Sequence, residues 1–333
     1  MNRTTIGLIL GDPAGVGPEI CAKLIAARTD REDLQIVAFG SRRSLENGMK
    51  IAGYGENRVP GVAAVADMSA DARVALLATF EGPEIRPGAA SAEGGAATLE
   101  AMEAAAAAAN RGEIDAIVYA PLNKQAMWLA GHTAIDELHF FADRLGVDTF
   151  TCELNKQGRV WTSRVTSHIP LAEVARTISI ETVGRATRLG AETFAAAQGR
   201  PPRIAVAGLN PHLGEGGAMG REEIDILGPA IDELRAEGYD IAGLYPADTV
   251  FLRVEAEGID LVITMFHDQG QIALKALGFG ATSTILGGLP LPVVTASQGT
   301  AYDIVGQNRA DPSGMIGAFD LACQLATAKQ LDA

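Results

Sequence analysis

The stretch LVITMFHDQGQIALK, Leu261–Lys275, decides the fold class of the chain. Its first part, Leu261–Phe266, is apolar and rich in β-branched residues, and a run of that length predicts a strand buried on both faces, as in a parallel sheet. Beyond Gly270 the apolar residues fall at helical spacing, which predicts a helix with Lys275 exposed. A histidine, a carboxylate and an amide therefore stand at the carboxyl end of a strand, where open α/β sheets bind ligands.

The composition indicates a two-lobed cytoplasmic protein. A chain of 333 residues exceeds one average domain. Its net charge of −14 would repel nucleic acids and acidic membranes, so we expect neither as a partner. The N-terminal apolar run Ile6–Leu10 is too short for a signal peptide or a membrane span. The cysteines are scattered and form no CxxC pair, which predicts reduced thiols at Cys21, Cys152 and Cys323.

Other predicted strands also end in polar segments. The first, Thr5–Leu10, leads into GDPAGVGPEI (Gly11–Ile20), whose glycines could hold an anion. Because neither GxGxxG nor GK[ST] is present there, a tight strand-to-helix turn is the favoured interpretation. A later strand, Ala116–Tyr119, is followed by polar residues and by a predicted loop that contains His132 and Thr133.

Three of the five histidines follow predicted strands, close to Gly or Pro: His168, His212 and His267. Taken singly, each would be interpreted as a surface residue or a satisfied core residue. Together they suggest a metal site, because imidazole suits Zn, Co, Ni and Mn and three protein ligands leave positions open for substrate oxygens. Their wide spacing matches no local metal motif, so both interpretations stay open at this point. His139, in a predicted helix, has no assigned role.

The chain resembles a known family. In order, the motifs GDPAGVGPE, GHT, SHIPL, GLNPHLGEGG, PADT, HDQG and GTAYDIVG are similar to those of the 4-hydroxythreonine-4-phosphate dehydrogenase family of vitamin B6 (pyridoxine) biosynthesis. The resemblance covers nearly the whole chain, and the combination is more specific than any single motif. It implies an α/β fold like that of isocitrate and isopropylmalate dehydrogenases, with two α/β/α lobes and a cleft between them. Residues 1–127 with 296–333 would form the cofactor lobe, and residues 128–295 the metal, substrate and dimerisation lobe.

The same resemblance implies a homodimer with a shared active site, NAD(P) in the interlobe cleft and a divalent metal held by histidines of both subunits. The metal could be Zn, Co, Mn, Ni or Mg. Carried over by motif, the metal ligands would be His168, His212 and His267. Contacts with an anionic small-molecule substrate would come from His132, Thr133 and Lys275.

The segment Gln298–Gly306 resembles the adenosine loop of the isocitrate and isopropylmalate enzymes. Where NADP-using members have Lys and Tyr, this chain has Asp303 and Ile304, and a carboxylate near the ribose would repel a 2′-phosphate. The sequence therefore predicts NAD rather than NADP. Gln298 replaces the family's histidine, which would loosen the adenine contact. The predicted cofactor-binding residues are Gln298, Gly299, Thr300, Ala301, Asp303, Ile304 and Asp311.

Two expected substrate contacts differ from the family pattern. Thr284 stands where the biosynthetic family has Asn, and Val293 where it has Arg. Valine cannot make the bidentate, charge-assisted bonds that an arginine offers an anion, and losing such a partner typically costs about two decades in affinity. The substrate therefore stays open. Relatives in the family oxidise phosphorylated four-carbon acid sugars or the cis-dihydrodiol of terephthalate.

We expect an oxidative decarboxylation: a metal polarises a secondary hydroxyl, hydride passes to the nicotinamide, and CO₂ leaves. Lys275 would hold a substrate anion or relay a proton. Asp248 and Asp268 would orient the ligand histidines, with solvation or helix capping as the alternative. A zinc hydrolase with Glu215 as base is the alternative of another class, and a non-catalytic ligand-binding relative is a third.

Overall fold

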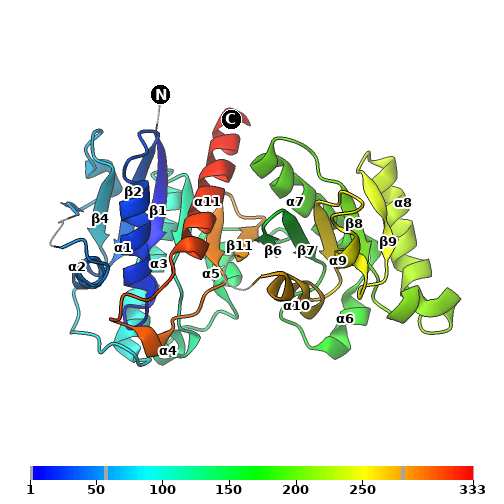
Figure 1. Cartoon of the computed structure of the whole chain (residues 1–333), viewed down its shortest axis with the longest axis horizontal. Coiled ribbons are helices and arrows are strands. Elements are labelled where there is room, and N and C mark those ends of the chain that lie inside the picture. Colours follow the sequence, from blue (N-terminus) through cyan, green and yellow to red (C-terminus); the bar gives the residue numbers. More distant parts are fainter. Residues whose placement is uncertain (1–2, 56–58, 279–281, 333) are drawn as a thin grey trace. The chain divides into compact units, whose positions relative to one another are not determined.

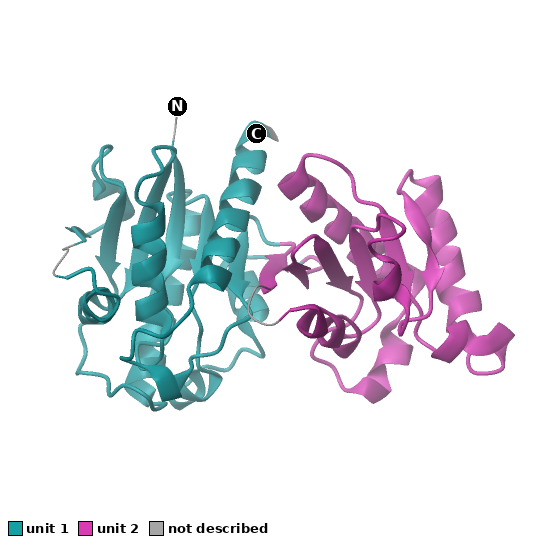
Figure 2. Ribbon diagram, in the orientation of Figure 1, with its two compact units in different colours: residues 1–148, 289–333 teal, residues 149–288 magenta. Residues whose placement is uncertain are grey.

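The computed structural model describes residues 3–55, 59–278 and 282–332. The chain folds as two compact units: unit 1, Met1–Asp148 with Leu289–Ala333, and unit 2, Thr149–Gly288 (Figure 2). The boundaries predicted at 127/128 and 295/296 therefore need correction. The cause is strand pairing, because β12 (Val293–Ala296) pairs in parallel with β5 (Ala116–Tyr119) and so belongs to unit 1.

Unit 1 is built on a parallel sheet with the strand order β3-β4-β2-β1-β5-β12. The order runs outward in both directions from β1 and β5, as in doubly wound folds. Besides β5 and β12, the strands of this sheet are β1 (Thr4–Ile9), β2 (Leu34–Gly40), β3 (Gly61–Val62) and β4 (Val74–Ala78).

Helices cover both faces of the unit 1 sheet. Figure 1 shows α1 and α11 in front of the strands and α3 behind them. The Ala-rich α3 begins where the Ser91 hydroxyl accepts a hydrogen bond from Gly94 N at 3.0 Å, which is a helix N-cap. The helices are α1 (Gly17–Arg28), α2 (Arg42–Ile51), α3 (Ala92–Asn110), α4 (Lys124–Leu129), α5 (Glu137–Arg144) and α11 (Ser313–Asp332), with short 3₁₀ turns at Val65–Asp67 and Tyr302–Ile304.

Unit 2 has a mixed sheet with the order β11-β6-β7-β10-β8-β9. Strand β6 is antiparallel to both of its neighbours, and the pairs from β7 to β9 are parallel. The strands are β6 (Cys152–Gln157), β7 (Val160–Arg164), β8 (Ile204–Ala207), β9 (Ile241–Tyr245), β10 (Leu261–Thr264) and β11 (Thr282–Gly287). The helices are α6 (Leu171–Thr177), α7 (Ile180–Gln198), α8 (Gly228–Ala236), α9 (Val250–Arg253) and α10 (His267–Leu277), with a 3₁₀ segment η2 (Pro211–Gly217) and a π-helical turn η3 (Glu223–Leu227).

The predicted central strand is present as β10, which is buried along its whole length between β7 and β8. The helix after it begins at His267 rather than beyond Gly270. The reason is that Phe266 is still extended, while Asp268 in the first turn interacts favourably with the helix dipole. Of the apolar residues expected on the helix's inner face, Leu274 is buried but Ile272 and Leu277 are exposed.

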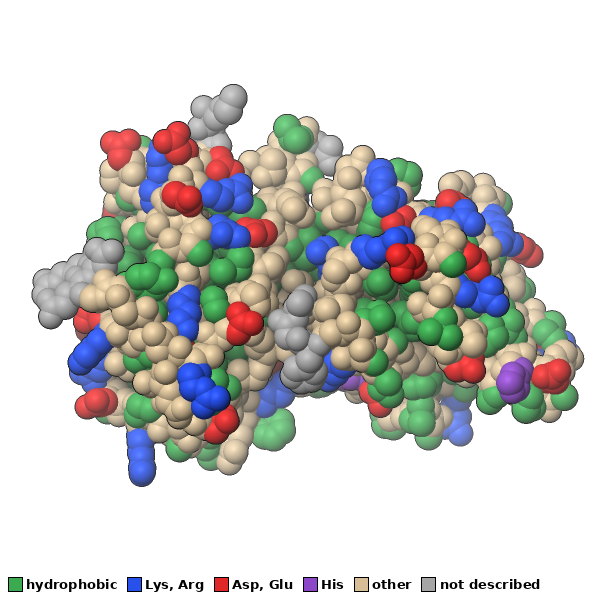
Figure 3. All heavy atoms as spheres, viewed as in Figure 1, with side chains coloured by type: hydrophobic (Ala, Val, Ile, Leu, Met, Phe, Trp, Pro, Cys, Tyr) green, Lys and Arg blue, Asp and Glu red, His purple; other side chains and the backbone are tan. Residues whose placement is uncertain are grey.

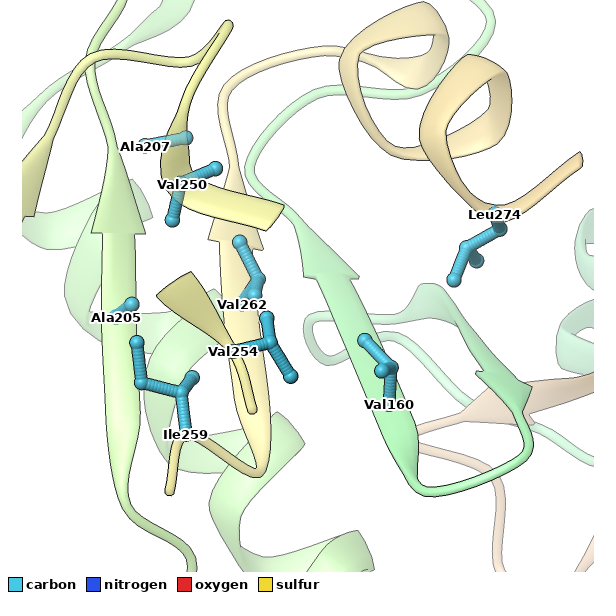
Figure 4. Close-up of a cluster of buried hydrophobic side chains, with 8 residues drawn as sticks. All are labelled: Val160, Ala205, Ala207, Val250, Val254, Ile259, Val262 and Leu274. Atoms are coloured by element: carbon cyan, nitrogen blue, oxygen red, sulfur yellow. The ribbon is translucent and has the colours of Figure 1, made fainter. Parts of the chain in front are cut away.

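A cluster of small aliphatic side chains fixes β10 between its neighbours. Figure 4 shows Val262 of β10 between Ala205 of β8 and Val160 of β7, with Leu274 contributed by α10. Helices α7 and α10 cover opposite faces of this sheet: Gly190 of α7 contacts Ser163 and Leu261, and Gly270 of α10 contacts Thr162 and Thr264. The carboxyl ends of β7 and β10 are thereby held side by side.

The charged side chains, the cysteines and the apolar content of the helices can be compared with the expectations from the sequence. On the face shown in Figure 3, acidic and basic side chains are interspersed. The cysteines are free, as predicted, and all of them are buried; burial raises the pKa of Cys323 to about 12. Among the described residues, no helix has both the length and the apolar content needed to cross a membrane.

Candidate active site

Two of the predicted metal ligands lie together in unit 2. His168 follows β7 and His267 follows β10, and because these strands are parallel neighbours, both histidines reach the same edge of the sheet. Their ring centroids are 5.7 Å apart. Both line a cavity of about 330 Å³ with Thr166, Ser167, Ile169, Leu171, Val174, Phe266 and Asp268.

The carboxylate next to His267 sets the orientation of its ring. Nδ1 of His267 lies 2.7 Å from Oδ1 of Asp268, so Nδ1–H donates a hydrogen bond to the carboxylate and the lone pair of Nε2 is left for another partner. This carboxylate–histidine arrangement is the one that accompanies metal-binding imidazoles. The imidazoles of His168 and His267 therefore suit a divalent metal. Asp268 lies close enough to His267 to orient its ring.

His212 does not join this pair. It is exposed on the turn after β8. Across residues 3–55, 59–278 and 282–332, no three His, Cys, Asp or Glu side chains gather closely enough to hold a metal. One copy of the chain thus brings together two of the three predicted imidazoles.

Lys275 and Asp248 are both exposed. Lys275 follows His267 on α10 by eight residues, about 2.2 turns, so the two positions lie about 80° apart around the helix axis. Asp248 lies between β9 and α9, and within the described chain no hydrogen bond or ion pair joins it to a histidine. The orienting role predicted for Asp248 is therefore without a contact in one copy of the chain.

A buried polar network lies beneath α10 and reaches the predicted substrate residue Thr284. Asn155 Nδ2 donates to Thr284 Oγ1 at 2.8 Å, and Gln271 Nε2 donates to Asn155 Oδ1 at 2.9 Å. Arg164 also donates to Asn155 Oδ1 and forms an ion pair with Glu153 at 3.1 Å. Sequence reasoning missed this network, although an arginine at the end of an apolar strand was a visible signal.

In unit 1, the predicted substrate residues His132 and Thr133 lie between α4 and α5. The His132 ring packs on Phe140, with centroids 5.8 Å apart. Burial lowers the pKa of His132, so its imidazole is neutral at physiological pH. Thr133 is exposed. A neutral imidazole and a hydroxyl form a contact surface that can donate hydrogen bonds.

Val293 cannot serve as a substrate contact. It lies on β12 with no exposed surface, paired with Ile117 of β5. Its prediction as a substrate residue is therefore wrong, because an aliphatic side chain at this position packs into the core of unit 1.

The predicted cofactor segment is held against the first loop of unit 1. Tyr302 donates its hydroxyl hydrogen to Asp12 Oδ2, and Val16 N donates to Thr300 O at 3.0 Å. Ala301, between these two anchors, has the left-handed φ of 42° that is uncommon outside glycine. Burial raises the pKa of Asp12, and burial together with the bond to Asp12 raises that of Tyr302.

The polar groups of this segment fit a dinucleotide. Gln298 Nε2 donates to Asp311 O at 3.0 Å, which leaves Oε1 as a buried acceptor with no partner in the described part of the chain. The exocyclic amino group of adenine is a donor of the matching kind. Asp303 is exposed, whereas Ile304 is half-buried. Bonds from Ser313 lower the pKa of Asp311, which caps the start of α11.

Comparison with known proteins decides the family. A family model described as pyridoxal phosphate biosynthetic protein PdxA matches residues 32–322. A Pseudomonas aeruginosa relative named "Putative 4-hydroxythreonine-4-phosphate dehydrogenase 2" is 43% identical over 324 residues, covering 96% of each chain. The chain belongs to the PdxA family.

Solved structures agree with this assignment. A 4-hydroxythreonine-4-phosphate dehydrogenase from Burkholderia phymatum superposes with a TM-score of 0.79 at 31% identity, covering 98% of this chain and 99% of that one. A terephthalate 1,2-cis-dihydrodiol dehydrogenase from Burkholderia xenovorans gives 0.68 at 28%, covering 97% and 98%. A β-decarboxylating dehydrogenase from Thermococcus kodakarensis shares the fold, with 0.53 at 13% identity, covering 98% and 84%.

The predicted family and α/β fold class are thereby confirmed, and the PdxA-family chain is a dehydrogenase, an oxidoreductase that uses NAD(P). The zinc hydrolase alternative is wrong. Among curated relatives, one from Bradyrhizobium diazoefficiens is named "Putative D-threonate 4-phosphate dehydrogenase" and is 35% identical over 342 residues, covering 98% of each chain.

Proposed function

We propose that the chain is a divalent-metal-dependent NAD dehydrogenase that oxidises a secondary hydroxyl and decarboxylates the product. The observation that carries the proposal is the pairing of His168 with His267, 5.7 Å apart by ring centroid, beside the carboxylate of Asp268. A structural role alone would not need two imidazoles in one cavity with a carboxylate bound to one of them.

His168 and His267 would hold the metal, with His212 of a second copy as the third ligand. When bound, a divalent metal acts as a Lewis acid on substrate oxygens. Asp268 fixes the His267 ring, so that Nε2 faces away from the carboxylate. The chain therefore acts as a homodimer in which each copy completes the site of the other.

The cofactor segment would bind NAD in preference to NADP. Asp303 is exposed and would repel a 2′-phosphate. The buried oxygen Gln298 Oε1 would accept a hydrogen bond from the adenine amino group. The glutamine would thus contact adenine at the position where the family has a histidine.

The substrate would be a small anion. The exposed ammonium group of Lys275 would hold its carboxylate or move a proton as CO₂ leaves. In unit 1, the neutral imidazole of His132 and the Thr133 hydroxyl would donate hydrogen bonds to its oxygens. Asp248 would act on a histidine only in the assembled dimer.

The buried Val293 and the short Thr284 favour a substrate other than 4-phospho-hydroxythreonine. The names of the Bradyrhizobium and Burkholderia xenovorans relatives indicate two classes, a phosphorylated four-carbon acid sugar and an aromatic cis-dihydrodiol. Of the network below α10, Arg164 and Asn155 are buried, so only the half-buried Thr284 would offer its hydroxyl oxygen to either class.

A screen for NADH formation tests the proposal. The purified chain would be supplied with Zn²⁺, Co²⁺, Mn²⁺, Ni²⁺ or Mg²⁺, with NAD or NADP, and with 4-phospho-hydroxythreonine, D-threonate 4-phosphate or terephthalate cis-dihydrodiol. We expect metal-dependent NADH formation with one of the last two, together with CO₂ release. His139→Ala is the matched control, because this exposed histidine lies outside the site; His267→Ala should be inactive. Undiminished activity after chelation would contradict the proposal.

A further inference from the structure

The turn that carries His212 has a backbone that L-residues disfavour. Residues 212–216 all have left-handed φ values: 51° for His212, 59° for Leu213, 75° for Gly214, 46° for Glu215 and 65° for Gly216. Non-glycine residues adopt this region as isolated residues, and a run of them persists only when the surrounding structure holds it in place. Such strained segments are concentrated at functional sites.

A buried carboxylate holds the segment that leads into this turn. Oε1 of Glu223 accepts the N–H groups of Leu209 at 2.8 Å and Asn210 at 2.7 Å, and Oε2 accepts Asn210 Nδ2 at 2.9 Å. Glu223 is 5% exposed and lies in a π-helical turn, a rare conformation that is frequent at functional sites. These bonds fix the backbone immediately before His212.

The contact of Glu223 with Gly214 fixes the turn from its inner side. A Cβ at Gly214 would lie 2.6 Å from Gly220 O and 3.1 Å from Glu223 Oε2, so the turn closes directly onto the carboxylate. Met219 N donates to Gly214 O at 3.0 Å across the base of the turn. The Glu223 carboxylate therefore lies against the inner side of the turn that carries the exposed His212.

The same loop is tied to the segment that carries His267. Gln269 Nε2 donates to Gly208 O at 2.9 Å, and Gln269 Oε1 accepts Met265 N at 2.8 Å. The amide thus links the residues that precede His267 to the residues that precede the turn. The segments that carry His212 and His267 are therefore joined through the hydrogen bonds of one side chain, Gln269.

We infer that Glu223 is a positioning residue for His212: it holds the left-handed turn so that the imidazole is presented outward before metal or a second copy arrives. The inference rests on the proposed function, in which His212 is a metal ligand. Pre-organisation of this kind removes an ordering cost from binding, and loss of outer-shell support of a metal ligand lowers affinity about 10- to 100-fold.

The test is a Co²⁺ titration of the metal-free full chain, followed by the visible absorbance of the bound ion. We expect Glu223→Ala to weaken Co²⁺ binding about 10- to 100-fold. Asp225→Ala is the matched control, because it removes the same charge from the same π-turn, where Asp225 is exposed and pairs with Arg221; it should stay within about twofold of wild type. Equal affinity in the two variants would overturn the inference.

A rescue variant separates positioning from a general electrostatic effect. Adding Glu215→Gly to Glu223→Ala places a residue that tolerates positive φ at an exposed position of the turn, so most of the lost affinity should return. No recovery would overturn the inference. If Glu223→Ala does not fold, Glu223→Gln keeps one acceptor oxygen and should bind Co²⁺ more weakly than wild type. Failure of the proposed function is distinct: wild type and His267→Ala would then bind Co²⁺ alike.

Discussion

At the scale of single residues, the sequence was most informative where a functional side chain follows a buried strand. His168 and His267 could be predicted as neighbours because parallel strands end at one edge of a sheet. Val293 could not be assigned correctly, since a single valine in an apolar strand carries no sign of which face or core it will enter. Arg164 and Asn155 were missed because their contact depends on the antiparallel pairing of β6, which the sequence did not reveal.

Gln298 yields a prediction at this scale. Its amide is fixed by donation to Asp311 O, and in the proposed function the buried Oε1 would accept a hydrogen bond from the adenine amino group. Nicotinamide hypoxanthine dinucleotide has a carbonyl oxygen in place of the adenine amino group, and two acceptors would oppose each other. Wild type should therefore prefer NAD over this analogue by about 10- to 100-fold in kcat/KM, the effect of an unsatisfied buried group.

The same measurement on variants checks the cause. Gln298→Ala should remove most of the preference, while Gln307→Ala, which changes an exposed amide in the same segment, should keep it. If Gln298→Ala discriminates as well as wild type does, adenine is not recognised by this amide.

At the scale of elements, the strands were predicted better than the turns. The apolar runs of β8 and β10 were visible as buried strands, and the residues that follow them were identified as polar. The start of α10 at His267 was missed, because the apolar periodicity begins only one turn later. The left-handed turn at 212–216 could not be predicted, since His212, Leu213 and Glu215 give no local signal for positive φ; the signal lies in Glu223, which is distant in sequence.

Asp260 yields a prediction about the entry of β10. Its carboxylate accepts two bonds from Arg200, both at 2.8 Å, and one from Arg203 N at 2.9 Å. The bonds from Arg200 are the main cause of a lowered pKa for Asp260. Because the folded pKa lies below the unfolded value, the stabilisation is present above the unfolded pKa and is lost as the pH falls through the folded one.

Asp260→Asn should therefore lower the free energy of unfolding by about 1 to 3 kcal/mol at neutral pH. The difference from wild type should be constant down to about pH 4 and shrink below it. Urea unfolding followed by circular dichroism over this range measures both quantities. Asp240→Asn, in an exposed ion pair with Arg203, is the control and should change stability by less than about 1 kcal/mol. A difference that grew toward acid pH would contradict this account of Asp260.

At the scale of the whole molecule, the sequence indicated a first lobe that is interrupted by a second, but it misplaced the boundaries. The reason is that β12 looks like a continuation of the β11 segment in sequence, whereas it pairs with β5 of unit 1. The family and the dehydrogenase class were accessible because seven motifs occur in order along nearly the whole chain. The substrate was not, because the altered positions show which contacts are lost and not which replace them.

The central claim is that His168 and His267 of one copy act with His212 of another. Subunit complementation tests it most directly: His168→Ala and His212→Ala, each inactive alone, are unfolded together, refolded as a mixture and assayed for NADH formation. In a shared site, half of the dimers are mixed and each has one intact site, so about one quarter of wild-type activity should return. If the mixture stays as inactive as its components although mixed dimers form, the three histidines do not meet across two copies and the account is contradicted.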